Sequence, residues 1–261
     1  MVRSMKEIII KTAREAGKTL LDHFGGEKAS TIHERKSRYD YSTEVDKMVE
    51  DKIIEKFQEK GVKGTVIAEE GGKIELTDDD YTIYVDPLDG TINYSMGIPI
   101  FCTSIGVKKG KEMEMGVIYY PIRDELYFAQ KGKGAYLNDE KIHLTKEEKL
   151  GESIIEVGWS SGQRKQRDDL LKRLEGVLSL RMMWSAALGV AFVGCGRFDG
   201  LVHTSAHHPW DIAAGSIIIE EAGGKITDFE GKRWDEDSKT LIVANKTLHK
   251  KILRLLEDWG E

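Results

Sequence analysis

An apolar run from Tyr81 to Val85 leads directly into Asp86-Pro87-Leu88-Asp89-Gly90-Thr91, and this junction constrains the chain more than any other feature. The run is typical of a β-strand, and Pro87 and Gly90 restrict the turn that follows it. Two carboxylates three positions apart across such a turn can point into one pocket. An ordinary acidic turn is the alternative, because Asp-Gly pairs commonly bond their own backbone. The full motif would match by chance with a probability on the order of 10⁻⁴, which favours a site.

Carboxylates paired in this way suit divalent cations. Mg²⁺ prefers octahedral oxygen coordination and keeps several waters, so acids from a few loops and a substrate phosphate can complete its shell. The amides of Gly90 and Thr91 are placed to open a helix, whose N-terminal N–H groups attract an anion. We therefore expect metal ions and a phosphate group to meet at this turn.

Composition narrows the class of protein and of partner. The chain has 261 residues, 40% hydrophobic and 32% charged, which fits one large domain or two small ones that share a core. A net charge of -6 gives no basic field for nucleic acid or an anionic membrane. No apolar run is long enough to cross a bilayer, and we expect no signal peptide. Cys102 and Cys195 lack CxxC spacing, so we expect neither a disulfide nor a zinc site, and a cytoplasmic location.

Hydrophobic spacing predicts a mixed α/β chain. Apolar residues at intervals of three and four predict helices over 5–24 and 45–57, the second capped by Thr43. The polar segment 27–42 between them is predicted to be a loop. The remaining predicted strands are 64–68, 81–85, 115–120, 125–129, 153–157, 225–227 and 241–243, and the remaining predicted helices are 167–177, 185–193, 210–221 and 248–259.

The chain resembles the inositol monophosphatase family, a group of lithium-sensitive, Mg²⁺-dependent phosphatases. Five segments carry the resemblance in order: Glu69-Glu70, Asp86 to Thr91, Gly132 to Asn138, Trp210 to Gly215 and Glu221 to Thr227. The resemblance spans most of the chain and implies an α/β (α+β) fold, a layered α-β-α-β-α sandwich of the sugar phosphatase type, and a homodimer. An N-terminal α+β half, 1–145, is expected to carry most metal ligands, and a C-terminal α/β half, 146–261, to complete the site.

The resemblance also implies metal and catalytic residues. One Mg²⁺ would be held by Glu69, Asp86 and the Leu88 carbonyl. A second would be held by Asp86, Asp89 and Asp211, so that Asp86 bridges the two. A third, weaker ion would lie near Glu69, which would also take part in water activation. Thr91 and Asp46 match a pair that orients the attacking water.

Several of these residues also fit a purely structural role. Asp46 fits a capping box with Thr43, and Asp211 follows Pro209 where a helix N-terminus favours an acid. Glu70 is expected to be a solvated turn residue. Lys36 and Asp40 lie in the polar loop that approaches the metals in the family, although a lone lysine in a loop is more often solvated.

Two further stretches have a structural alternative. His207 and His208 are adjacent and so lack the spacing for one shared zinc ion, and we expect a loop role for them. The stretch Met182 to Trp184 is predicted to be a core strand, with a dimer surface as the alternative.

The substrate is less constrained than the metals. The implied substrate-binding residues are Asp89, Gly90, Thr91, Ser185, Ala186, His203 and Arg164. Trp184 replaces a glycine that usually precedes the Ser/Thr-Ala pair, and His203 replaces an acid that contacts inositol hydroxyls. The basic run that starts at Arg164 either meets a distal phosphate or is a solvated helix start.

We therefore expect a phosphomonoesterase that acts on inositol monophosphate, fructose 1,6-bisphosphate or both. The alternatives are a 3′-phosphoadenosine 5′-phosphate phosphatase and a non-catalytic metal-binding regulatory protein. Thr91, Glu69 and Asp46 argue against the last alternative, because a binding module has no need for a pair that orients water.

Overall fold

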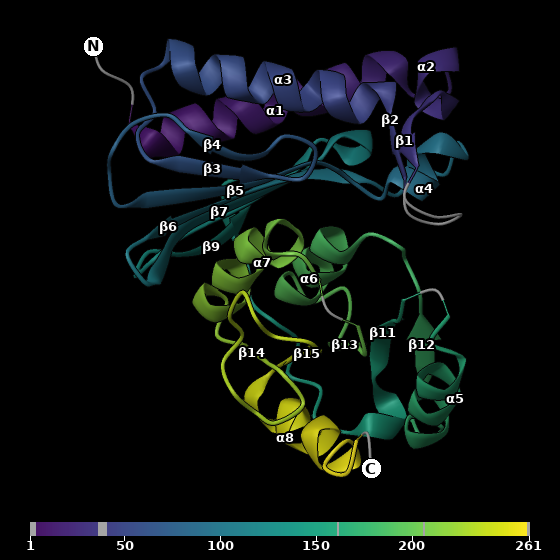
Figure 1. The fold of residues 1–261 in the computed structure, drawn as a ribbon. Coiled ribbons are helices and arrows are strands. Elements are labelled where there is room, and N and C mark those ends of the chain that lie inside the picture. The colour runs from purple at the N-terminus through teal and green to yellow at the C-terminus, as the bar shows by residue number, and fades with distance from the viewer. Residues whose placement is uncertain (1–3, 36–40, 161, 206, 260–261) are drawn as a thin grey trace.

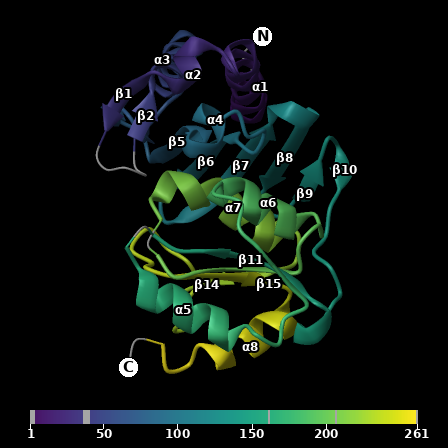
Figure 2. The ribbon, with the colours of Figure 1, turned by 90° about the vertical axis from the view of Figure 1, so that its right-hand side faces the viewer.

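The computed structural model describes residues 4–35, 41–160, 162–205 and 207–259, and their helices and sheets stack in five layers (Figure 1). Each sheet has helices on both faces (Figures 1 and 2). This is the predicted α-β-α-β-α sandwich. From one outer face to the other, the layers are α1 (Met5–His23) with α3 (Glu44–Glu59), an eight-stranded sheet, α6 (Ala186–Gly194) with α7 (Pro209–Glu221), a five-stranded sheet, and α5 (Arg164–Arg173) with α8 (Lys246–Leu255).

The eight-stranded sheet brings two of the acidic segments together. Its order is β10-β9-β8-β7-β6-β5-β3-β4, and only β3 and β5 run parallel. Because Ala68, the last residue of β3, pairs with Val85 within β5, Glu69 follows the end of β3 beside Asp86 of β5. The strands are β3 (Thr65–Ala68), β4 (Gly72–Glu75), β5 (Tyr81–Asp89), β6 (Cys102–Lys109), β7 (Glu112–Tyr120), β8 (Glu125–Gln130), β9 (Gly134–Leu137) and β10 (Glu140–Lys141).

The five-stranded sheet contributes a second edge to the same region. Its order is β12-β11-β13-β15-β14, and β11 pairs in parallel with both β12 and β13. Gly158 and His203 pair at the carboxyl ends of β11 and β13, so both lie at one edge. The strands are β11 (Ile154–Gly158), β12 (Ser179–Arg181), β13 (Gly200–His203), β14 (Lys225–Thr227) and β15 (Leu241–Ala244).

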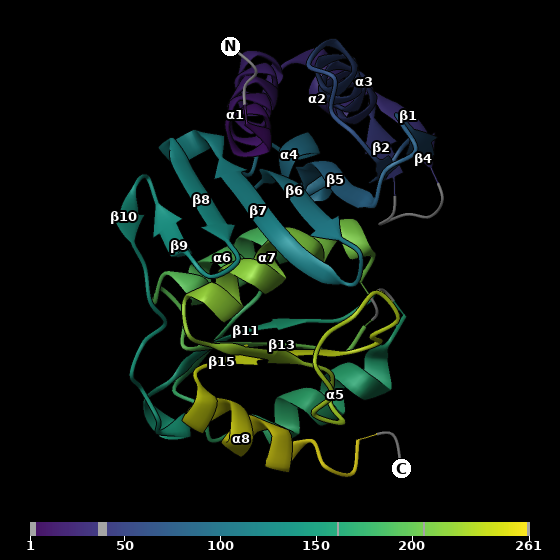
Figure 3. The ribbon, with the colours of Figure 1, turned by 90° about the vertical axis from the view of Figure 1, so that its left-hand side faces the viewer.

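The α6 and α7 layer lies between the two sheets and packs on both (Figure 3). Both helices are apolar on nearly every side because each packs against a sheet on two opposite sides. Two glycines let α7 approach the first sheet closely: a Cβ at Gly116 would lie 2.4 Å from the Ala214 carbonyl oxygen, and one at Gly106 would lie 2.8 Å from the Ala213 Cβ. This contact places Asp211, in the first turn of α7, above the ends of β3 and β5.

Two predictions about local structure were wrong. The segment predicted as a loop over 27–42 contains α2 (Glu27–Ser30) and an antiparallel pair, β1 (Ile32–Arg35) and β2 (Tyr41–Thr43). The segment gave no strand pattern because residues 32–34 of β1 are exposed and the buried positions of β2, Ser42 and Thr43, are polar. The stretch Met182 to Trp184 is not a core strand, because β12 ends at Arg181 and the Met182 and Trp184 side chains are 38% and 43% exposed.

Other features match the sequence analysis at the level of whole elements. The short α4 (Thr91–Ser95) follows Gly90, whose φ of +98° and tight fit against the Ile100 carbonyl oxygen require glycine. Both cysteines are unpaired. Within the described residues, no helix is long and apolar enough to cross a membrane. The division into halves 1–145 and 146–261 stays a prediction, since α6 and α7 join the two sheets.

Candidate active site

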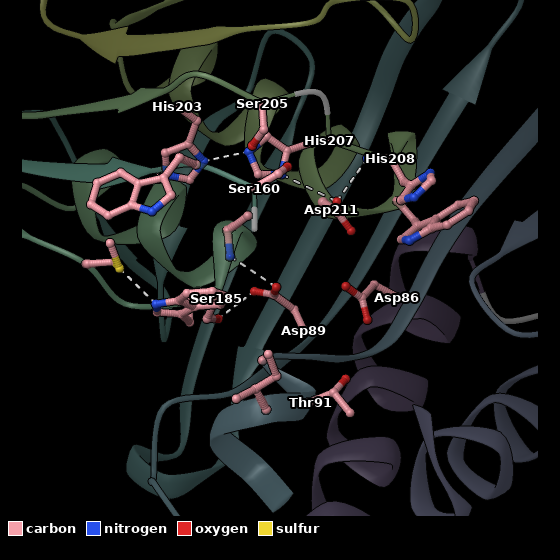
Figure 4. A pocket seen from close by; sticks show the side chains of 18 of the residues that line it. Asp86, Asp89, Thr91, Ser160, Ser185, His203, Ser205, His207, His208 and Asp211 are labelled. Carbon is pink, nitrogen blue, oxygen red and sulfur yellow. Dashed lines mark hydrogen bonds and ion pairs between the residues drawn. The ribbon is translucent and has the colours of Figure 1, made fainter. Parts of the chain in front are cut away.

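A cavity of about 660 Å³ opens where the carboxyl ends of β3, β5, β11 and β13 meet the N-termini of α6 and α7 (Figure 4). Asp86, Asp89 and Asp211 lie around the same space, with Thr91 beside them. Segments far apart in the sequence thus converge on one site. The predicted residues that line the cavity are Glu69, Asp86, Leu88, Asp89, Gly90, Thr91, Ser185, Ala186, His203 and Asp211.

One predicted substrate-binding residue lies elsewhere. Arg164 is exposed in the first turn of α5 and does not line the cavity. The structure therefore does not bring its guanidinium to the site. Lys36 and Asp40 fall outside the described residues.

Burial and mutual repulsion act on the acids of this cavity. Burial, together with the charges of Asp211 and Asp46, raises the pKa of Glu69 well above its ordinary value. Burial and the neighbouring Glu69 carboxylate raise the pKa of Asp86 in the same way. Burial raises the pKa of Asp89 to about 6, with Asp211 adding to the effect.

The donor set fits a hard divalent cation. Of the described residues that line the cavity, none is lysine or arginine, so no such side chain there neutralises the acids. Carboxylate oxygens and the Leu88 carbonyl are ligands that Mg²⁺ prefers. As the side chains of the described residues lie, no three His, Cys, Asp or Glu groups are close enough to hold one ion. Metal binding therefore requires some carboxylates to turn into the cavity.

The Asp89 carboxylate is hydrogen-bonded to the protein in this structure. It accepts hydrogen bonds from the Ser185 hydroxyl and from the amides of Ala186 at 3.0 Å and Ala187 at 2.9 Å. These amides belong to the first turn of α6, where a negative charge is favoured. The predicted residues Ser185 and Ala186 thus contact Asp89 directly, and Asp89 stabilises α6 as well as lining the cavity.

Thr91 and Asp46 form the predicted pair. The Thr91 hydroxyl lies 2.9 Å from the Asp46 carboxylate and 3.1 Å from the Leu88 carbonyl oxygen. Asp46 also accepts from the Thr43 amide at 2.8 Å, which completes the capping box of α3. Asp46 is therefore both a helix cap and the partner of Thr91. Burial raises its pKa to about 6.

Glu50 is a buried acid that the sequence analysis missed. It lies one turn after Asp46 on the inner face of α3, is 1% exposed, and accepts from the Glu70 amide at 2.8 Å. Glu70 is half-buried in the turn after Glu69 and is not simply solvated. Two acids of α3 thus hold the two loops that carry Glu69 and Thr91. The signal in the sequence was an acid between Val49 and Ile53 on an apolar helix face.

Glu156, His203 and His207 form a second group of polar side chains along the cavity. The two histidines were named from the sequence, and Glu156 was missed. Glu156 is 1% exposed and bonds the His203 ring at Nε2. The other ring nitrogen of His203 lies 2.6 Å from His207 Nε2, and His207 Nδ1 lies 3.5 Å from the Asp211 carboxylate (Figure 4). The chain of contacts reaches from the strand β11 to a predicted metal ligand. An acid inside the apolar run 153–157 was the available signal.

His208 and Trp210 lie at the N-terminus of α7. Their rings stack with centroids 4.5 Å apart, and the His208 amide donates to the Asp211 carboxylate at 3.0 Å. Asp211 therefore caps its own helix, as its position after Pro209 predicted. His207 and His208 do lie in a loop, and both line the cavity.

Comparisons with known proteins match nearly the whole chain. The model of the inositol monophosphatase family matches residues 1–261. A Thermococcus kodakarensis protein named fructose-1,6-bisphosphatase/inositol-1-monophosphatase is 35% identical, covering 97% of each chain. A Xylella fastidiosa protein named Nus factor SuhB is 37% identical, covering 94% of this chain and 91% of its own.

Solved structures show the same fold. The extragenic suppressor protein suhB of Bartonella henselae superposes with a TM-score of 0.93 at 30% identity, covering 98% of this chain and 100% of its own. An inositol monophosphatase of Thermotoga maritima gives a TM-score of 0.88 at 31% identity, covering 97% of this chain and 96% of its own. The names of these relatives differ in substrate and role.

Proposed function

We propose, since the chain belongs to the inositol monophosphatase family, that this phosphatase is a Mg²⁺-dependent phosphomonoesterase for a small polyol or sugar phosphate. The observation that carries the proposal is the group of acids, the buried Asp86 and Asp89 and the half-buried Glu69 and Asp211, around one cavity whose described lining has no lysine or arginine. Two or three ions would be held there by Glu69, Asp86, Asp89, Asp211 and the Leu88 carbonyl.

The residues around the acids suit hydrolysis by water. When bound, Mg²⁺ supplies charge neutralisation for the phosphate and the leaving oxygen, and makes water easier to deprotonate. Thr91 donates its proton to Asp46 or to the Leu88 carbonyl, so the oxygen of its hydroxyl is left to accept a hydrogen bond from water. That bond would orient the water for in-line attack. Glu69, which lines the same cavity, would take part in activating this water.

The cavity wall favours a substrate with hydroxyl groups. His203 and Ser205 lie on the side of the cavity away from Thr91 (Figure 4), and Glu156 lines the same cavity, so polar groups are available for a polyol. Inositol monophosphate and fructose 1,6-bisphosphate both fit this chemistry, and relatives carry both names. The Thr91–Asp46 pair supports catalysis over a non-catalytic regulatory role.

A substrate panel tests the proposal. Phosphate release from inositol 1-phosphate, fructose 1,6-bisphosphate and 3′-phosphoadenosine 5′-phosphate is measured with Mg²⁺ and with excess chelator. We expect turnover of at least one of the first two, inhibited by Li⁺ and abolished by the chelator. Arg164→Ala is the matched control: because Arg164 is exposed outside the cavity, it should leave all rates within about twofold.

Two outcomes would contradict the proposal. Undiminished turnover in chelator would remove the metal role, and release from the nucleotide alone would favour the phosphoadenosine phosphatase alternative.

We also propose a homodimer, which the family resemblance implies. The cytoplasmic location stays a prediction.

A further inference from the structure

Trp184 has a backbone conformation that a bulky residue rarely adopts. Its φ is +56°, in the left-handed region, which favours glycine. The other non-glycine residues with positive φ in the described chain are Asp124, Asn138 and Asp139, and short Asp and Asn side chains tolerate this region well. Trp184 is therefore the exception that needs a reason. Strain of this kind is concentrated at functional sites.

Contacts from three elements hold this strained turn. The Asn93 side-chain amide, on α4, donates to the carbonyl oxygens of Met183 at 2.8 Å and Trp184 at 3.3 Å. The Met183 amide donates to Glu156 at 3.3 Å, on β11. On the other side, the Ser185 hydroxyl donates to Asp89. The position of Trp184 is thus fixed from the same loops that carry the acids.

The indole of Trp184 forms part of the cavity lining. Its ring N–H faces the Met182 sulfur. Trp159 and Met182 line the same cavity. Trp184 is 43% exposed and lines the cavity. An apolar side chain therefore lies one residue from Ser185, which contacts Asp89.

We propose that Trp184 determines specificity by packing its indole against the ring of the substrate's alcohol part. This inference rests on the proposed phosphatase function and names the substrate class within it. An indole supplies a large, flat apolar surface, and a sugar or cyclitol ring presents C–H groups of matching shape. Glu156, His203 and Ser205 remain for the hydroxyls. The enzyme should then prefer phosphate esters of cyclic polyols to acyclic ones.

Three substitutions of Trp184 distinguish the effect of losing the indole ring from the effect of relieving the backbone strain. Trp184→Gly and Trp184→Ala both remove the indole, but only glycine relaxes at positive φ, while Trp184→Phe keeps an aromatic ring. We compare inositol 1-phosphate with glycerol 2-phosphate, an acyclic ester, by kcat and KM. Leu178→Ala, at an exposed residue outside the cavity, is the control.

We expect Trp184→Gly and Trp184→Ala to raise KM for the cyclic ester about tenfold, with little change in kcat, because the indole does not touch the reacting atoms. The acyclic ester should change by less than about twofold, and Trp184→Phe should retain most of the preference. Trp184→Gly should melt at a temperature at least equal to that of Trp184→Ala, and about 2–4 °C higher if the strain is released fully.

The inference is overturned if KM for the cyclic ester is unchanged in Trp184→Gly and Trp184→Ala. It is also overturned if KM rises by the same factor for the cyclic and the acyclic ester. Failure of the phosphatase proposal looks different, because the parent protein would then release phosphate from neither ester. In that case calorimetric binding of inositol 1-phosphate with Mg²⁺ decides the point. Tighter binding to the parent than to Trp184→Gly supports the role of the indole, and equal binding removes it.

Discussion

Asp86→Asn is expected to lower kcat/KM for the preferred substrate by about 10³-fold or more. Asp86 is 2% exposed and lies between Glu69 and Asp89, whose charges both act on it. Asparagine keeps the shape and can still accept from the Leu88 amide, which lies 2.9 Å from the carboxylate. It removes the charge that would bridge two cations. A decrease of kcat/KM by this factor corresponds to the loss of several kcal/mol of charge stabilisation, since about 1.4 kcal/mol changes a rate tenfold.

The control for this variant is Asp78→Asn, an exposed aspartate of the loop between β4 and β5. It should retain full activity and Mg²⁺ dependence. Asp86 is a cleaner target than Asp89, because Asp89 also accepts from the α6 amides and its replacement would disturb that helix. Asp86→Asn with activity within about tenfold of the parent would contradict the bridging role.

The second large effect is on the stability of the metal-free protein, which should fall as pH rises from about 5 to about 8. Burial raises the pKa of Asp46 and of Asp89 from 3.8 to about 6 in the folded state. A raised folded pKa gives stability that is complete below the unfolded pKa and is lost as pH rises through the folded pKa. Burial also raises the pKa of Glu69 and of Asp86 well above the ordinary value, so both acids add to the loss in the same direction.

The size of this effect is measurable. Each pKa unit corresponds to about 1.4 kcal/mol, so Asp46 alone accounts for a loss on the order of 3 kcal/mol between pH values below 3.8 and pH values above 6, of which about 1.4 kcal/mol falls between about pH 5 and about pH 8. Mg²⁺ binds the deprotonated acids and should restore stability mainly above about pH 6. The measurement is the melting temperature with chelator and with Mg²⁺ at about pH 5 and about pH 8, where each kcal/mol shifts it by about 2–4 °C.

Asp86→Asn serves as the matched variant for this experiment. It removes one of the mutually repelling acids, so its melting temperature in chelator should depend less on pH and respond less to Mg²⁺. A parent protein that is equally stable at both pH values in chelator, or one that Mg²⁺ fails to stabilise, would show that the acids do not repel one another as their burial implies.

The acidic site could be predicted from the sequence because its residues follow local rules. Asp86 and Asp89 follow an apolar run at the end of the strand β5, Asp211 lies in the first turn of a helix, and Asp46 caps another. Each signal is short-range, so pattern and resemblance sufficed to identify them. Their meeting depends on the parallel pairing of β3 with β5 and on the packing of α7 over both, which the family resemblance implied and spacing alone did not.

The remaining features depend on tertiary contacts. Glu50 and Glu156 are single acids in apolar stretches, and only the folded chain shows that they accept from the Glu70 amide and bond His203. The exposure of Met182 and Trp184 was mispredicted, because hydrophobic residues next to a strand usually extend it. Here the chain turns at Trp184 instead, since Asn93 and Asp89 fix the backbone on either side.

Diffraction from crystals soaked in Mn²⁺, which scatters anomalously and accepts the same oxygen ligands, tests the central assignment most directly. We expect at least two anomalous peaks in the cavity. One should be bound by Glu69, Asp86 and the Leu88 carbonyl, and the other by Asp86, Asp89 and Asp211. The oxygens should lie about 2.0–2.2 Å from each ion. An empty cavity at saturating Mn²⁺, or ions bound only elsewhere, would contradict the account.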